Sequence, residues 1–257
     1  MSFQPGADAS SALQRKGVVL NEMKGAMAPH AARYTRELAR LLYPTSTYHH
    51  NSGGEPSAIP ELTHDALKAF HATHYHPSNA RFFSYGDLPL EATLAAVQRN
   101  ALGRFDSALA DAKLRAFEVR DETRFEAPRR AEITVPAEAV VLDEEKQTCV
   151  SVAWLLAPRV GPGVDGFEEF ALAVASDLML SGADAAFHAP LLASGLGAGF
   201  APGTGYGGSR RETSFAVGLR NVAPADVPEV ESRIHATFAK IADEGFPAER
   251  VAAVTHQ

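Results

Sequence analysis

Residues 80–85, ARFFSY, constrain the fold most, because their aromatic content predicts one β-strand within a stretch that is otherwise helical. Gly86 and Asp87 follow this segment as a turn signal. One strand cannot form a sheet, since its backbone N–H and C=O groups need a neighbouring strand. We therefore expect the partner strands of residues 80–85 to lie in a segment upstream of this sequence.

Helices are predicted on both sides of this strand, because apolar residues recur at helical spacing before and after it. Pro29 separates the first two helices, and Pro44 ends the second. Thr63 is a suitable N-cap for the third helix, and Pro89 suits the first turn of the fourth. The predicted helices cover Lys16–Met27, His30–Leu42, Thr63–Tyr75 and Leu90–Phe105.

A second unit is predicted beyond residues 106–128, a charged stretch that ends in proline and indicates a linker. A solvated helix is an equal alternative for residues 106–117. The second unit contains predicted strands at Arg130–Val135, Thr148–Leu156 and Glu212–Val222, and predicted helices at Phe167–Leu180, Ala183–Ala193, Pro224–Gly245 and Ala248–Gln257. The fold class is therefore α+β, with two incomplete layers whose mixed, mainly antiparallel sheets are covered by helices on one face.

The segment Gly195–Gly208 holds seven glycines in fourteen residues. It does not indicate a phosphate-binding loop, because the Walker lysine is missing and no G-x-G-x-x-G opens a helix after a strand. Two interpretations stay open. The segment is either a flexible hairpin connection into the strand at Glu212–Val222, or a surface that approaches a peptide backbone or the first unit closely.

Glu22 is the candidate functional residue with the clearest physical argument. It shares one helix face with Val18, Val19, Gly25 and Ala26, which are apolar or small. If this stripe packs inward, the carboxylate is buried with it and needs a cation, a metal ion or a proton. No His, Arg or Lys occupies those neighbouring positions. The partner of Glu22 must therefore come from elsewhere in the fold or from outside this chain.

Composition argues against several classes of protein. A net charge of −7 argues against a nucleic-acid partner, because phosphate binding needs a surplus of Lys and Arg. No apolar run approaches the roughly 20 residues that cross a bilayer, and the N-terminus does not resemble a secretory signal, so no membrane partner is expected. The single cysteine, Cys149, fits a reducing compartment, and a cytoplasmic location is predicted. Cys149 is expected to be buried in a strand, and Trp154 to be a core or interface residue.

Three separated blocks of the sequence resemble the presequence-protease branch of the pitrilysin/insulinase zinc metallopeptidase family. They are KGVVLNEMKG at 16–25, the stretch from YHHNSGGEPS to FFSYGD at 48–87, and SGLGAGFAPGTGY at 194–206. The blocks follow one another in the family's order, and the resemblance runs from about Lys16 to the last residue.

The resemblance implies a zinc site to which Glu22 contributes. In that family the glutamate of the N-E-M-K-G block is the third zinc ligand, and only Glu22 matches it here. Two histidine ligands and a catalytic glutamate would come from an inverted H-x-x-E-H helix upstream. None of the ten histidines lies in that motif or in its mirror H-E-x-x-H. Residues 1–15 are too few and too polar to hold the missing helix, so the chain is expected to be a fragment.

The resemblance also implies the domain organisation and the activity. Residues 1–15 are expected to be a disordered start, 16–105 the C-terminal part of the zinc-bearing domain, and 129–257 the N-terminal part of a second, non-zinc peptidase-like domain. The intact enzyme would degrade short unstructured peptides, and the missing N-terminal and C-terminal segments would be partners of this chain. Residues 44–61 would be a connector or a loop that borders the substrate cleft. Because one carboxylate does not hold zinc at ordinary concentrations, this polypeptide alone is expected to be inactive.

Two alternatives from other classes stay open. The chain could be a non-catalytic scaffold or regulatory subunit of the same fold, although a buried Glu22 would argue against this. It could also bind zinc independently through its clustered histidines, although His76 is expected to point away from the other two rings of its segment. The histidines concerned are His49, His50, His71, His74 and His76.

Overall fold

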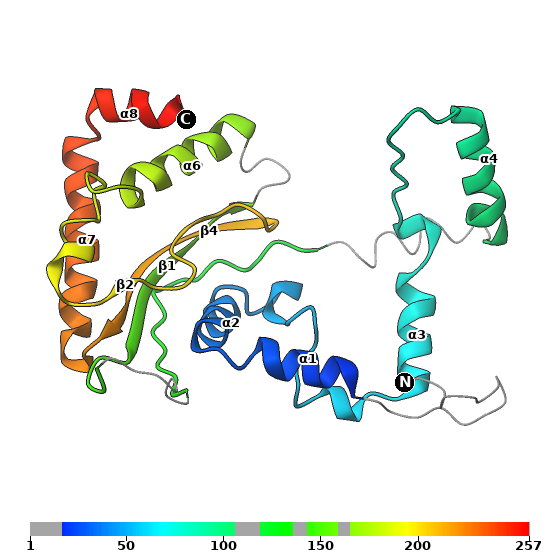
Figure 1. Ribbon diagram of the computed structural model, residues 1–257, viewed down its shortest axis with the longest axis horizontal. Coiled ribbons are helices and arrows are strands. Elements are labelled where there is room, and N and C mark those ends of the chain that lie inside the picture. The colour runs from blue at the N-terminus through cyan, green and yellow to red at the C-terminus, as the bar shows by residue number, and fades with distance from the viewer. Residues whose placement is uncertain (1–16, 106–118, 136–142, 159–164, 257) are drawn as a thin grey trace. The chain divides into compact units, whose positions relative to one another are not determined.

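The computed structural model describes residues 17–105, 119–135, 143–158 and 165–256 (Figure 1). Internal contacts divide the chain into two units. One unit combines Met1–Gly53 with Asp121–Gln257, and the other is Gly54–Arg120. The two N-terminal helices therefore group with the sheet of the second half of the chain, and each unit is described by itself below.

An antiparallel sheet organises the larger unit. Its long strands are β1 (Thr148–Pro158) and β4 (Glu212–Val222), which pair with Trp154 opposite Phe215. Two short strands, β2 (Gly199–Phe200) and β3 (Gly205–Gly207), also pair with β4. Both long strands were predicted from their apolar patterns, and the pairing confirms that the glycine-rich segment is a hairpin connection into β4.

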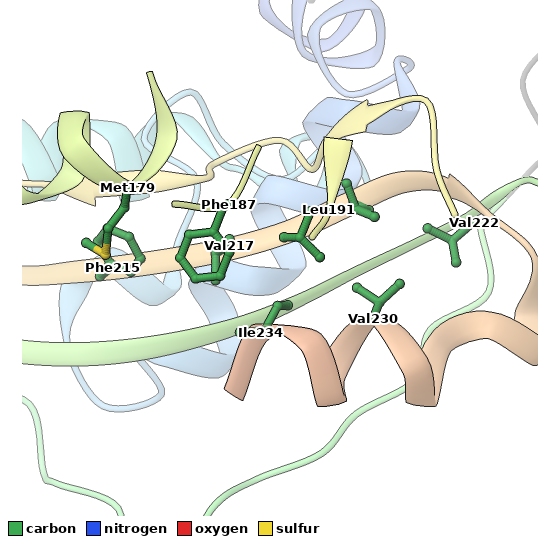
Figure 2. Close-up of a cluster of buried hydrophobic side chains, with 9 residues drawn as sticks. Met179, Phe187, Leu191, Phe215, Val217, Val222, Val230 and Ile234 are labelled. Atoms are coloured by element: carbon green, nitrogen blue, oxygen red, sulfur yellow. The ribbon is translucent and has the colours of Figure 1, made fainter. Parts of the chain in front are cut away.

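The main core lies on one face of this sheet. Helix α7 (Val227–Glu244) turns Val230 and Ile234 toward the strands, and both side chains are fully buried (Figure 2). They meet Val217 of β4 and a turn region that contributes Phe187 and Leu191. The end of α6 (Gly166–Leu180) adds Met179 to the same cluster, and α8 (Ala248–Thr255) contacts α6. Hydrophobic burial on this face is the main source of stability for the unit.

The opposite face of the sheet is covered by an N-terminal helix. Helix α2 (His30–Leu42) follows α1 (Val18–Ala26), and both helices were predicted. Buried Leu42 and Tyr43, at the end of α2, pack with Ala153 and Leu155 of β1. The α+β class is confirmed, but helices lie on both faces of this sheet and not on one face as predicted.

The smaller unit consists of α3 (His64–His74), α4 (Leu90–Asn100) and connecting segments. Thr63 caps α3 as predicted, because its side chain accepts a hydrogen bond from the Ala66 N–H. The strand predicted for residues 80–85 is wrong, since these residues have no regular structure. Phe83 and Tyr85 are 88% and 90% exposed, so an aromatic segment without a neighbouring strand stays unpaired here.

Two further predictions of regular structure are wrong. The predicted strand Arg130–Val135 lacks regular structure, because it pairs with no strand among the residues described. The predicted helix Ala183–Ala193 is a series of turns that ends in a short 3₁₀-helix, Leu192–Ser194. Pro190 removes a helix hydrogen-bond donor there. Residues 1–15, and 106–118 of the predicted linker, lie outside the described residues.

None of the helices in the described ranges combines the length and apolar character that a membrane span requires.

Candidate functional site

Glu22 is exposed on α1, together with the apolar residues beside it. The side chains of Val18 and Val19 are 68% and 52% exposed, and α1 has no buried residue. The expectation that this stripe packs inward and buries Glu22 is therefore wrong for the described part of the chain. The reason is that α1 is anchored through its other side and not through this stripe.

The anchors of α1 come from α2 and from the loop after it. The carbonyl oxygen of Met27 accepts a hydrogen bond of 3.0 Å from Nε of Arg33. The sulfur of Met23 lies 3.7 Å from Nδ2 of Asn51. Glu22 therefore has a defined position relative to α2, with its own face turned away from these contacts.

The histidines of the smaller unit do not converge. The ring of His71 stacks on Tyr75 at 4.7 Å between centroids, and the ring of His74 lies 4.1 Å from that of Phe70. Nδ1 of His76 lies 2.7 Å from the Ser78 hydroxyl. Within the described residues, no three His, Cys, Asp or Glu side chains form a group that could hold a metal ion.

His49 and His50, in the larger unit, meet edge to face at 5.2 Å. An independent histidine zinc site would need a third donor near them, and the described residues bring none into such a group. The described residues therefore do not form a complete zinc site. Glu22 is a suitable and accessible oxygen ligand, but a site with three protein ligands would need at least one donor from outside the described residues.

Two buried carboxylates form a polar cluster that the sequence patterns do not indicate. Glu212 is fully buried and Glu122 is 4% exposed. One oxygen of Glu212 accepts a 2.7 Å hydrogen bond from the Glu122 N–H, and the other accepts one of 2.7 Å from Arg124. Each buried charge thus has charged or polar partners, as burial requires.

The side chain of Glu122 reaches the loop after α2. Its Oε1 accepts hydrogen bonds from the Thr45 N–H at 3.0 Å and from the Thr45 hydroxyl, and its Oε2 accepts one of 2.9 Å from the Ser46 N–H. Burial raises the pKa of Glu122, but these hydrogen bonds outweigh that effect and hold the pKa below its usual value. Glu122 is thus held as a carboxylate inside a segment that was predicted to be linker.

Arg210 and Arg211 extend this cluster beside Glu212. The guanidinium of Arg210 lies over the ring of Tyr43 at 4.9 Å. Nε of Arg211 donates to Asp121 at 2.8 Å, and the Arg211 N–H donates to the Tyr48 hydroxyl at 2.8 Å. Three consecutive residues, two just before β4 and one at its start, therefore contact the loop after α2 or the segment 121–124. No local signal marks these partners, because they are far apart in the sequence.

Cys149 lies in β1 beneath α2, as predicted, but it is half-buried and not fully buried. Burial raises its pKa to about 12. The neighbouring hydroxyl of Tyr34 donates a 2.6 Å hydrogen bond to Ser151, and burial also raises the pKa of Tyr34. Such a thiol is protonated at neutral pH, so it is not a nucleophile.

A cavity of about 550 Å³ lies where α6, α7 and α8 meet. Leu178, Ile241 and Phe246 form part of its wall. Its Arg250 is engaged by Asp184 at 3.3 Å and by the Ser181 carbonyl at 2.6 Å. These contacts indicate a helix junction in which the arginine has a structural role.

Comparison with known proteins places these features in a family context. Residues 61–257 match the family model described as "Peptidase M16 inactive domain". The chain is 41% identical over 250 residues to the mitochondrial presequence protease of Xenopus tropicalis, and 40% identical over 250 residues to that of Mus musculus. These alignments cover 97% of this chain but only 24% and 23% of the relatives, so the chain spans about a quarter of their length.

Solved structures agree on the fold. A peptidase M16 inactive domain from Pseudomonas fluorescens matches with a TM-score of 0.56 at 21% identity, covering 93% of this chain and 53% of that one. A protease from Helicobacter pylori matches with a TM-score of 0.58 at 16% identity, covering 92% and 53%. At this identity the likeness concerns the fold alone.

Proposed function

Because this chain belongs to the peptidase M16 family, as its resemblance predicted, we propose that it is part of a zinc metalloendopeptidase and that Glu22 supplies one zinc ligand. The intact enzyme would hydrolyse short unstructured peptides. The proposal rests on family membership and on the match of Glu22 to the glutamate of the N-E-M-K-G block.

The observation that carries the role of Glu22 is its exposure beside uncovered apolar side chains. Val18 and Val19 stand on the same face of α1. Apolar residues exposed around one carboxylate are what a surface presents when another polypeptide segment covers it. Donors carried by that segment would reach Glu22 without displacing any of the residues that the structure describes. A second polypeptide segment that covers α1 is thus part of the proposal.

The exposed side chains of the smaller unit also indicate that another polypeptide segment covers this chain. Among its described residues, only His76 is buried, while large side chains of α3, α4 and residues 82–88 are exposed. Such a unit buries too little apolar surface to be stable by itself. We propose that the remaining parts of the longer protein cover the exposed apolar side chains of this unit.

This polypeptide alone should not hydrolyse peptides. Its sequence has one candidate ligand and no H-x-x-E-H glutamate to serve as a general base. The assay is cleavage of an unstructured peptide by the purified chain, with added zinc or with EDTA. Turnover that EDTA abolishes would contradict the proposal that the remaining ligands and the base lie elsewhere.

The role of Glu22 can be tested in a chimaera. Residues 17–256 would replace the matching quarter of the Xenopus tropicalis presequence protease, and zinc content per folded protein would be measured. Glu22→Gln should lose most of the zinc, because it removes one of three protein ligands. Glu91→Gln is the control, since Glu91 is an exposed helix carboxylate on α4. Equal zinc content in both variants would overturn the assignment of Glu22.

A scaffold or regulatory role without metal is the second candidate. The argument against a scaffold role required Glu22 to be buried. Because Glu22 is exposed, the scaffold role stays a candidate. A scaffold predicts that the chimaera with Glu22→Gln retains its zinc content and its peptide cleavage. The same measurements therefore separate the two candidates.

The cellular location stays a prediction. A cytoplasmic location was expected from the single cysteine, whereas the relatives from Xenopus tropicalis and Mus musculus are named as mitochondrial. Fractionation of cells that express the natural gene would decide between the two compartments.

A further inference from the structure

The polar cluster around Glu122 and Glu212 joins three segments of the larger unit. Glu212 at the start of β4 holds the segment 121–124 through the Glu122 N–H and Arg124. The Glu122 side chain then holds Thr45 and Ser46, just after α2. We call Glu122 and Glu212, with these contacts, the carboxylate latch.

The latch lies at the end of a continuous path of contacts to α1. The Tyr43 hydroxyl donates to the Glu212 carbonyl at 3.1 Å, which fixes the C-terminal end of α2 to β4. Nη1 of Arg36, within α2, donates to the His49 carbonyl at 2.6 Å, which orders the loop that reaches Asn51. Asn51 contacts Met23, the residue next to Glu22.

We propose that Glu122 and Glu212 are positioning residues, which fasten the α1–α2 segment to the β1–β4 sheet and thereby fix where Glu22 stands. The fastening itself is independent of any metal, whereas its consequence for a zinc ligand rests on the proposed function. Both carboxylates act through α2 and the loop after it.

Charge and burial explain why two carboxylates serve this purpose. Glu122 accepts three hydrogen bonds from one short loop segment through two oxygens, whereas a glutamine side chain offers only one acceptor oxygen. Glu212 is fully buried, so its two oxygens hold the Glu122 N–H and Arg124 without competition from water. Removal of the Glu122 carboxylate leaves the Thr45 and Ser46 N–H groups without these acceptors. The loop after α2 should then separate from the sheet.

The chain carries a separate probe for each face of the sheet. Its only cysteine, Cys149, lies half-buried against Tyr34 of α2, so release of α2 should expose the thiol further. Its only tryptophan, Trp154, packs on the opposite face against Phe238 of α7, with ring centroids 5.0 Å apart. Loss of the latch should therefore change the first probe and leave the second unchanged.

The test compares Glu122→Ala and Glu122→Gln with Glu126→Gln, a control carboxylate that is exposed in the same segment. In native buffer we expect the rate of Cys149 alkylation to rise about tenfold or more in Glu122→Ala and less in Glu122→Gln, while Trp154 emission stays unchanged. Hydrogen exchange should become faster in α1 and α2 but not in α6 or α7. The control should match the parent chain in every measurement.

Two results would overturn the proposal. One is an unchanged Cys149 rate in both Glu122 variants while Trp154 stays packed, since α2 would then be held without the latch. The other is loss of Trp154 packing in both variants, because the carboxylate would then support the whole fold and not the docking of one segment. If only Glu122→Ala unfolds, the Cys149 alkylation rate and the Trp154 emission of Glu122→Gln test the proposal instead.

These measurements need no zinc, so they separate this proposal from the assignment of Glu22. In the chimaera, Glu122→Gln should weaken zinc affinity several-fold, while Glu22→Gln abolishes binding. Faster Cys149 alkylation with unchanged zinc affinity would overturn the positioning role. Zinc retained in Glu22→Gln would overturn the proposed function and leave the latch result standing.

Discussion

The buried carboxylate of Glu212 accepts a hydrogen bond of 2.7 Å from the backbone N–H of Glu122, 90 residues earlier in the chain. This contact joins the first residue of β4 to a segment without regular secondary structure. Since Glu122 also holds the loop after α2, the N-terminal helices and the sheet become parts of one unit. The carboxylates of Glu122 and Glu212 thus hold the N-terminal helices against the sheet.

Replacement of Glu212 by alanine should destabilise the larger unit by about 1–3 kcal/mol, because buried hydrogen-bond donors lose their acceptor. The larger values measured for buried ion pairs do not apply, since the Arg124 side chain is 45% exposed and keeps its hydration. Urea unfolding followed by Trp154 emission measures the change. Glu244→Gln, which removes an exposed pair with Lys240, is the control and should stay within about 0.5 kcal/mol of the parent chain. Equal effects of the two substitutions would contradict this account.

Acid should weaken the docking of α2 through Glu122. The folded-state pKa of this carboxyl lies below its usual value of 4.5, so its contribution is complete above that pH and is lost as the pH falls through the folded-state pKa. Glu212 and Arg124 are the charged groups beside it, and Thr45 and Ser46 face its oxygens. Hydrogen exchange of α2 amides against pH measures the effect.

The comparison for this pH dependence is the Glu122→Gln chain. At neutral pH, the α2 amides of this variant should be less protected from exchange than those of the parent chain. Their protection should also change less with pH below about 4.5, because the titrating group is gone. Parallel curves for the two chains would show that other carboxylates control the acid response, and the prediction would then be wrong.

The elements that were predicted correctly are determined by the pattern of their own residues. In β4, Phe215, Val217 and Leu219 alternate with smaller residues, and this alternation matches the face buried against α7. The stripe of α7 is similarly complete, and Gly245 ends the helix with a φ of 69° as expected of a C-terminal glycine. For such segments, periodicity alone identifies the buried face.

The wrong predictions concern properties that depend on a partner elsewhere. Residues 80–85 have strand composition, but a strand forms only where another strand accepts its hydrogen bonds. Glu22 lies on an apolar stripe, but a stripe is buried only where another surface covers it. The latch was missed for the same reason, because Glu122 lies in a charged segment that has the composition of a linker.

Cys149 should react slowly in the folded chain. A pKa of about 12 instead of the ordinary 9.0 lowers the thiolate fraction at pH 8 by about 1,000-fold, and α2 also restricts access. Alkylation by iodoacetamide at pH 8, followed by mass spectrometry, should therefore be slow in native buffer and fast in urea. Tyr34→Phe removes a hydroxyl whose hydrogen bond lowers the Cys149 pKa, so this substitution should slow alkylation modestly. Native alkylation as fast as that of free glutathione would contradict the raised pKa and the half-buried position of Cys149.

Two glycines of this chain should respond oppositely to alanine. A Cβ at Gly218 in β4 would lie 1.9 Å from the Val150 carbonyl oxygen, so the paired strands would have to separate, and Gly218→Ala should destabilise the unit by about 3 kcal/mol or more. A Cβ at Gly25 in α1 would meet no atom within 4 Å, and Gly25→Ala should stabilise α1 by roughly 0.5–1 kcal/mol. Thermal unfolding followed by Trp154 emission measures the first change, and hydrogen exchange of α1 measures the second. A Gly218→Ala chain as stable as the parent would mean that β1 and β4 are not paired in this register.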